Sequence, residues 1–228
     1  MKISITPSVA RIHAHICGDG CVYTKLEKYS EKQLQSHSRK QKHEKVWIIE
    51  YTNTCKELLE SFEEDMQKAF NRKVRKKVKK HSLEVHSCKW IVDELNLQNK
   101  NSYNWQIPSF IRNSNQKVIC SWLQAFFDDE ATVCKTRKRI RVKSMHHPGL
   151  KQVKLILSKI RIDSNITGPN CDNSYYLTIR SSELDKYHKK VGFIHPAKVR
   201  ILKSLGSNQC FQEIKYGPAG TLKSKENI

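Results

Sequence analysis

The sequence predicts an α+β fold of two similar half-domains, each an antiparallel sheet with helices on one face. Three observations lead to this. The order helix, strand, strand, helix, strand, strand, helix can be assigned twice along the chain. The expected strands alternate apolar and polar residues, which leaves one face of each sheet open. Each half also contains an apolar helical run that ends in acidic residues. The expected boundaries are 1–97 for the first half-domain, 98–112 for a linker, 113–205 for the second half-domain and 206–228 for a C-terminal tail.

The first half-domain is expected to open with a helix over 7–20, because Pro7 favours a helix start and Gly-Asp-Gly a helix end. A long polar loop or hairpin tip is expected over 31–45, and the basic run 71–80 is compatible with either a helix or a strand. The remaining elements are strands over 21–28, 46–51 and 82–88 and helices over 55–70 and 89–97.

The second half-domain repeats this order in compressed form. Ser114 or Asn115 is expected to cap the helix of the second apolar run. Strands are expected over 132–134, 137–143, 161–167 and 174–180, and helices over 148–160 and from Ser181 or Ser182 to about 191. The piece 45–62 should match 139–157, and 82–97 should match 176–191.

Charge points to the class of partner. The chain has 42 Lys and Arg against 22 Asp and Glu, a formal charge of +20, for which nucleic acid is the default partner and a solvated basic surface the plain alternative. No apolar run approaches a membrane span and no signal peptide is evident, which predicts a soluble cytoplasmic protein with no membrane partner. The eight cysteines form no Cys-x-x-Cys pair, so free thiols are favoured over a zinc site or disulfide framework.

Both apolar helical runs end in carboxylates at matching positions. Asp19 lies in Gly-Asp-Gly, and it aligns with Glu130 in Asp-Asp-Glu-Ala. The helix dipole disfavours an acid at a helix C-terminus, whereas a divalent cation, which prefers oxygen ligands, would favour it. Small residues at Ala14, Gly18 and Ala125 would let the two helices approach closely and bring the two acids together.

The segments Ile12-His-Ala-His-Ile-Cys-Gly-Asp-Gly20 and Leu123-Gln-Ala-Phe-Phe-Asp-Asp-Glu-Ala131 resemble the motif of the LAGLIDADG homing endonucleases. Two copies in one chain are similar to the monomeric members found in archaeal introns. The second copy departs from the family pattern at Ala131, where glycine is usual, and at Asp129, where a small residue is usual. The resemblance implies two pseudo-symmetric half-domains (αββαββα) that form a DNA-binding saddle.

The resemblance also implies an activity. It implies a site-specific endonuclease that hydrolyses both strands of a DNA duplex with Mg²⁺ and leaves 3′ overhangs, with Mn²⁺ or Ca²⁺ able to occupy the same sites. Asp19 and Glu130 would be the catalytic and metal-binding acids, with the backbone carbonyls of Gly18 and Asp129 as further ligands. The family places a basic residue beside the scissile phosphate. By position Lys89 matches best, and Lys143 is the alternative.

Basic and polar side chains on the expected open strand faces and in the basic run 71–80 are candidates for DNA contacts. Arginines would read base edges in the major groove, while lysines would contact phosphates. The candidates are Arg137, Arg139, Arg141, Lys143, Tyr176, Thr178 and Arg180 in the second half, and Lys76, Lys77, Lys79 and His86 in the first. Arg137, Arg139, Arg141 and Lys143 are expected on one face of a strand.

Two other functions fit the same fold. One is an RNA maturase that assists splicing of its host intron, and the other is a catalytically inactive DNA-binding protein. Acids at both helix ends argue against a pure binder, because negative charge facing phosphate weakens binding. The expected partner is a long, pseudo-palindromic DNA duplex bound by a monomer, with intron RNA as a partner in the maturase case.

Overall fold

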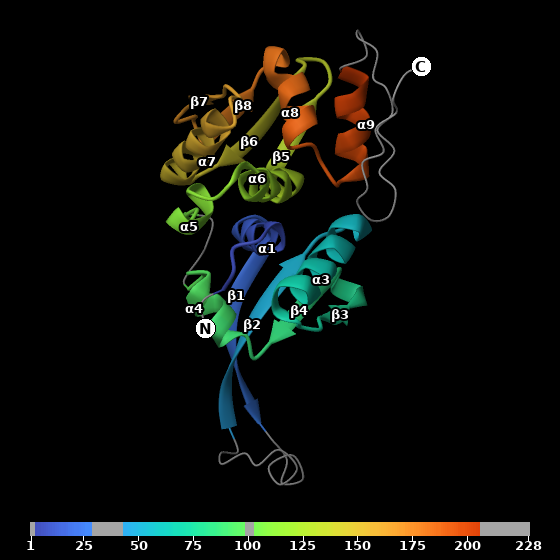
Figure 1. Ribbon diagram of the computed structural model, residues 1–228, viewed down its shortest axis with the longest axis vertical. Helices are drawn as coiled ribbons and strands as arrows, with labels where there is room; N and C mark the ends of the chain where they lie inside the picture. The colour runs from blue at the N-terminus through green and yellow to red at the C-terminus, as the bar shows by residue number, and fades with distance from the viewer. Residues whose placement is uncertain (1–2, 29–42, 99–102, 206–228) are drawn as a thin grey trace, which may run out of the picture.

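The computed structural model describes residues 3–28, 43–98 and 103–205 (Figure 1). The expected tail at 206–228, most of the expected loop at 31–45 and residues 99–102 of the expected linker lie outside these residues. Among the residues described, no helix is long and apolar enough to cross a membrane.

The first half contains a four-stranded antiparallel sheet in the order β1-β2-β4-β3. The basic run over 71–80 forms a short strand and a 3₁₀ turn rather than a helix. In chain order the elements are α1 (Pro7–Cys17), β1 (Gly20–Lys28), β2 (His43–Thr52), α3 (Lys56–Phe70), β3 (Arg75–Lys77), the 3₁₀ turn Val78–Lys80, β4 (Ser82–His86) and α4 (Lys89–Glu94).

The second half has the same topology, with the sheet order β5-β6-β8-β7. Its last helix, α9 (Pro196–Leu205), was not expected from the sequence pattern. The other elements are α5 (Ser109–Arg112), α6 (Gln116–Glu130), β5 (Ala131–Cys134), β6 (Arg139–Ser144), α7 (His147–Lys159), β7 (Asn165–Thr167), β8 (Tyr175–Ile179), the 3₁₀ turn Ser181–Glu183 and α8 (Leu184–Lys190).

Strand register fixes which residues of the two halves are equivalent. Gly20 pairs with Tyr51 in the first sheet, and Ala131 pairs with Val142 in the second. Tyr51 is therefore equivalent to Val142, an offset of 91 (142 − 51). The expected match of 45–62 with 139–157 corresponds to an offset of 94 (139 − 45). It therefore aligned each residue of the first half with one three positions too far along the second half.

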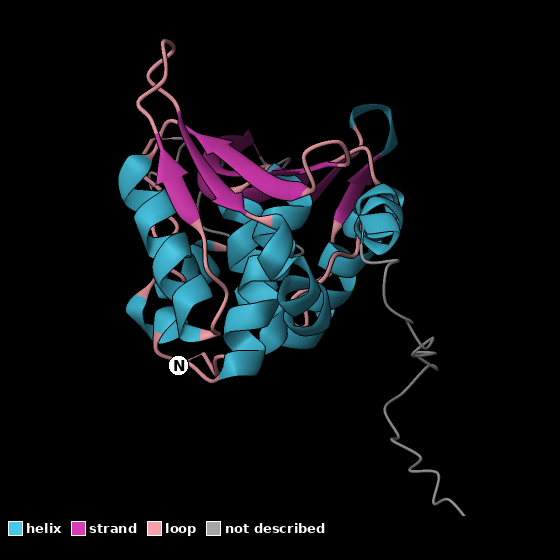
Figure 2. Cartoon of the chain, turned by 90° about the horizontal axis from the view of Figure 1, so that it is seen from above, coloured by secondary structure: helices cyan, strands magenta, loops and turns pink. Residues whose placement is uncertain are grey.

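The two long apolar helices α1 and α6 lie side by side at the centre of the molecule (Figure 1), as expected. The strands gather on one side and the helices on the other (Figure 2), so each sheet keeps an open face. Helix α1 serves both cores, because Ile12 packs into the first-half cluster and Ala14 into the second. The expected cap of α6 is confirmed, since the Asn115 side chain accepts a hydrogen bond from the Val118 N–H.

Candidate functional site

Two acids meet where helices α1 and α6 end. Asp19 is exposed just after α1, and Glu130 is the half-buried last residue of α6. Burial raises the pKa of Glu130 to about 7, and repulsion from Asp19 and Asp129 adds to the effect. Burial and the Asp129 charge likewise raise the pKa of Asp19. The Asp19 charge therefore lies close enough to disfavour ionisation of Glu130, a repulsion that a cation between the two acids would relieve.

The side chain of Asp129 faces the other helix and is fully buried. Its carboxylate accepts hydrogen bonds from the ring of His15, with Nδ1 at 2.9 Å, and from the Tyr51 hydroxyl at 2.7 Å. A Cβ on Gly18 would lie 2.8 Å from the Cβ of Asp129, so the absence of a side chain at position 18 makes room for the acid. Asp129, which stands where the resembling family usually has a small residue, is thus accommodated by hydrogen bonds from His15 and Tyr51 of the first half.

Asp128 holds the start of α9 against the end of α6. Its carboxylate accepts backbone N–H bonds from Ile194 and His195, each at 2.9 Å at the shortest. Burial raises the pKa of Asp128 to about 6, although these two hydrogen bonds oppose the rise. The geometry thus gives Asp128 a packing role near the end of α6.

Lys198 is a site residue that the sequence pattern did not single out. It extends from α9 to the end of α6, where its Nζ donates to the carbonyl of Phe127 at 3.0 Å and to that of Asp128. Burial lowers the pKa of Lys198, and the charges of all four nearby acids, Asp19 and 128–130, oppose this effect. A cation therefore already faces the acids. The helix that carries Lys198 was not expected from the sequence pattern.

The structure does not bring Lys89 to the acids. Strand β4 pairs antiparallel with β2, with Leu83 beside Tyr51 and His86 beside Ile48. Tyr51 also pairs with Gly20, the neighbour of Asp19, so β4 leads away from Asp19 toward Lys89. Its ammonium is exposed and pairs with Asp93 within α4.

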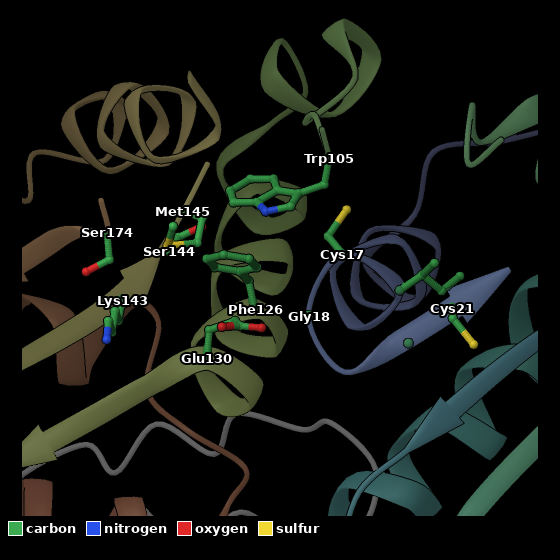
Figure 3. A pocket seen from close by; sticks show the side chains of 12 residues that line it. Cys17, Gly18, Cys21, Trp105, Phe126, Glu130, Lys143, Ser144, Met145 and Ser174 are labelled. Carbon is green, nitrogen blue, oxygen red and sulfur yellow. The ribbon is translucent and has the colours of Figure 1, made fainter. Parts of the chain in front are cut away.

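Lys143 and Glu130 line the same cavity of about 520 Å³ between the two halves (Figure 3). Trp105 and Phe126 form apolar walls on one side, while Glu130 and Lys143 supply charge. Lys143 also pairs with Asp172, Nζ to Oδ2, at 2.6 Å. Of the two lysines considered from the sequence, only Lys143 shares a cavity with one of the acids.

The open face of the second sheet is basic. Arg141 of β6 pairs with Thr178 of β8. The Arg141 guanidinium stacks over the Tyr176 ring, 4.0 Å from the ring centroid. Arg137, expected on this strand, lies instead in the turn that precedes Arg139. A four-residue turn between β5 and β6 replaces the start of the expected strand. Arg139, Arg141, Lys143, Tyr176 and Thr178 lie on β6 and β8, and Arg180 directly follows β8.

The open face of the first sheet is organised around an acid. Glu84 is buried and pairs with Lys77 and, at 3.1 Å, with His86 Nε2. Lys76 is opposite the core residue Leu83 and pairs with Glu63 of α3 at 2.6 Å, so it belongs to the helix side of the sheet. Lys76 thus lies on the opposite side of the sheet from Lys77, because a single register step changes the face. Lys79 is exposed in the 3₁₀ turn.

The carboxylates of Asp19 and Glu130 could supply only part of the coordination shell of a divalent ion. In the described part of the chain no three His, Cys, Asp or Glu side chains are grouped to hold a metal ion. Asp19 and Glu130 supply hard oxygen donors whose mutual repulsion a dication would remove. The remaining ligands must then be backbone carbonyls, water or phosphate oxygens.

Comparisons with known proteins agree with this geometry. Residues 117–192, about a third of the chain, match the family model of a LAGLIDADG-like domain. The homing endonuclease I-DmoI in complex with DNA and Mn has a TM-score of 0.58 at 17% identity, covering 83% of this chain and 98% of that one. A structure of its mesophilic variants has the same TM-score at 19% identity, covering 82% and 91%.

Full-length DUF199/WhiA from Thermatoga maritima has a TM-score of 0.54 at 12% identity, covering 92% of this chain and 63% of that one. No curated protein matches the chain. Residues 117–192 therefore match a LAGLIDADG-like domain, and the described part of the chain has the two-half fold of I-DmoI.

Proposed function

We propose that the chain is a site-specific endonuclease that hydrolyses both strands of a DNA duplex with a divalent metal. The observation that carries this is the convergence of Asp19 and Glu130 at the ends of two packed helices, beside the open faces of two antiparallel sheets. I-DmoI, which has the same fold, is a homing endonuclease whose structures contain DNA with Mn or Ca.

Asp19 and Glu130 would hold the metal, with the carbonyls of Gly18 and Asp129 as further ligands and Mg²⁺ as the expected ion. A bound divalent ion supplies an activated water and stabilises the leaving oxygen of a phosphodiester. The two acids bring negative charge to a site that must also receive phosphate. The excess positive charge of the chain offsets this by attracting the backbone of the duplex.

Lys198 takes the role of the basic residue at the acids. Two of its three N–H donors bond to carbonyls at the end of α6, where the Phe127 carbonyl also accepts the Ala131 N–H. Its charge also offsets the crowded carboxylates and so permits phosphate to approach. Lys143 would contact phosphate from the other side of the cavity shared with Glu130.

Arg139, Arg141, Arg180, Tyr176 and Thr178 would read base edges from the second sheet, and Arg137, Lys77, Lys79 and His86 would add contacts from turns and from the first sheet. Because the two halves differ in sequence, the target would be long and only pseudo-palindromic. We further propose 3′ overhangs, a monomeric and cytoplasmic enzyme, and an origin in an intron of archaeal type.

The test starts from binding rather than from a guessed site. Duplexes selected from a random library by the purified protein are cloned into a plasmid, which is then incubated with Mg²⁺ or Mn²⁺. The wild type should linearise the plasmid, whereas Asp19→Asn and Glu130→Gln should bind it with similar affinity and cut at least about 100-fold more slowly. Wild-type protein that binds the selected DNA without cutting it under any divalent ion would contradict the endonuclease. Preferential binding of structured RNA would favour the maturase.

A further inference from the structure

Asn53 connects a helix start to one of the two acids. It follows β2, and its Oδ1 accepts the Cys55 N–H at 2.9 Å, where α3 begins. Its Nδ2 donates to Asp19 Oδ2, also at 2.9 Å. Because the backbone fixes one end of this short amide, the other end holds the Asp19 carboxylate in one orientation.

Asp129 supports Asn53 from the opposite half of the molecule. Its Oδ1 lies 3.5 Å from Asn53 Nδ2 and 2.7 Å from the Tyr51 hydroxyl, while His15 holds its Oδ2. An acid of α6 is thus bound by three side chains of the first half. Since the Asp129 side chain is fully buried, this group has little freedom to move.

The second acid has no such support. Strand register makes Ser144 the equivalent of Asn53, and its hydroxyl accepts the His146 N–H at 3.0 Å in the same kind of turn. The serine side chain is shorter and carries no amide. Gly18 is equivalent to Asp129 and has no side chain. Across the described residues, the carboxylate of Glu130 accepts no hydrogen bond from another side chain.

We propose that Asn53, supported by Asp129, is a positioning residue for Asp19, and that Glu130 lacks an equivalent. The Asp19 site is therefore preorganised and the Glu130 site is not. Resting on the proposed function, this predicts that the two strands of the target depend unequally on the two equivalent residues, Asn53 in the first half and Ser144 in the second.

Asn53→Ser tests this directly, because serine keeps an acceptor for the Cys55 N–H but cannot reach Asp19. Its matched control is Ser144→Ala, which removes the equivalent turn acceptor from the second half. With each strand of the selected duplex labelled separately, Asn53→Ser should slow cutting of one strand by about tenfold to a hundredfold and accumulate a nicked product. Ser144→Ala should slow either strand by less than about threefold.

A second measurement does not depend on cleavage. Electron paramagnetic resonance of free Mn²⁺ gives the affinity of the protein–DNA complex for the ion. Asn53→Ser should weaken one class of Mn²⁺ site by about tenfold, with unchanged DNA affinity and melting temperature. Equal slowing of both strands, or wild-type cutting and Mn²⁺ affinity in Asn53→Ser, would overturn the proposal.

The two proposals fail in different ways. A wild type that binds Mn²⁺ on selected DNA without cutting would refute the endonuclease, and the Mn²⁺ affinity of Asn53→Ser would still decide the role of Asn53. A wild type that binds no Mn²⁺ would overturn both.

Discussion

The two sheets share one strand order but present different chemistry on their open faces. In the second sheet, the Arg141 guanidinium lies over Tyr176, and the acid that pairs with Lys143 is exposed. In the first sheet, Glu84 is buried and pairs with Lys77 and His86. The charge of +20 is therefore not equally available on the two faces.

This difference shows that topology can be duplicated while chemistry diverges. The second half contributes to its sheet cations whose partners are an exposed acid and an aromatic ring and, through α9, Lys198 to the acids. In the first half, the buried Glu84 pairs with Lys77 and His86 and so neutralises part of the positive charge of that sheet face. We expect the second half to dominate both the affinity for DNA and the charge balance at the acids.

The largest expected effect concerns Lys198. Replacing it by Met removes the ammonium but keeps an unbranched chain beside Phe193, and cutting should fall about 100-fold or more because the acids then face phosphate without compensation. The matched first-half variant, Lys89→Met, removes an exposed helical ion pair and should change cutting less than about threefold. Single-turnover cleavage with matched melting temperatures measures both, and a larger loss in Lys89→Met would refute the assignment.

A smaller effect is expected for one arginine of each sheet. Arg141→Ala should weaken binding to the selected DNA by about tenfold and relax the preference at one base pair. Arg75 lies opposite Glu84 and within 3.4 Å of His86 Nδ1, so Arg75→Ala should cost less. Titrations at one salt concentration against the target and its single-base variants would measure this. Equal losses would mean that both faces bind alike.

The sequence predicted the fold because its signals are local and repeated. Apolar spacing predicted α1 and α6, their acidic ends placed Asp19 and Glu130 together, and the amide of Asn115 marked a cap. The expected alternation of apolar and polar residues is also seen along β8, where Leu177 and Ile179 lie in the core.

What the sequence could not predict depends on register and on distant partners. The basic run 71–80 fits a helix or a strand equally, so it could not predict that Lys76 lies on the helix side, and a tight turn removed Arg137 from its strand. Lys198 could be assigned only once α9 was seen to return to the end of α6. The partners of Asp129 come from His15, Tyr51 and Asn53, which no pattern along the chain connects.

The smallest effect tests whether the Glu84 network is structural. Burial opposes ionisation of Glu84, but hydrogen bonds from Lys77, Tyr23 and His86 outweigh it and lower its pKa to about 2. Because the unfolded chain takes up the proton first, this carboxylate stabilises the fold above about pH 4.5, and the contribution is lost as pH falls toward 2.

Glu84→Gln should therefore lower the free energy of unfolding at pH 7 by up to about 3 kcal/mol, with less difference from wild type at pH 3. The matched variant Asp172→Asn removes the exposed acid of the second face and should change little, since exposed ion pairs contribute little to stability. Urea unfolding at both pH values gives these differences. If Asp172→Asn were the more destabilised protein, the buried network would not be what distinguishes the two faces.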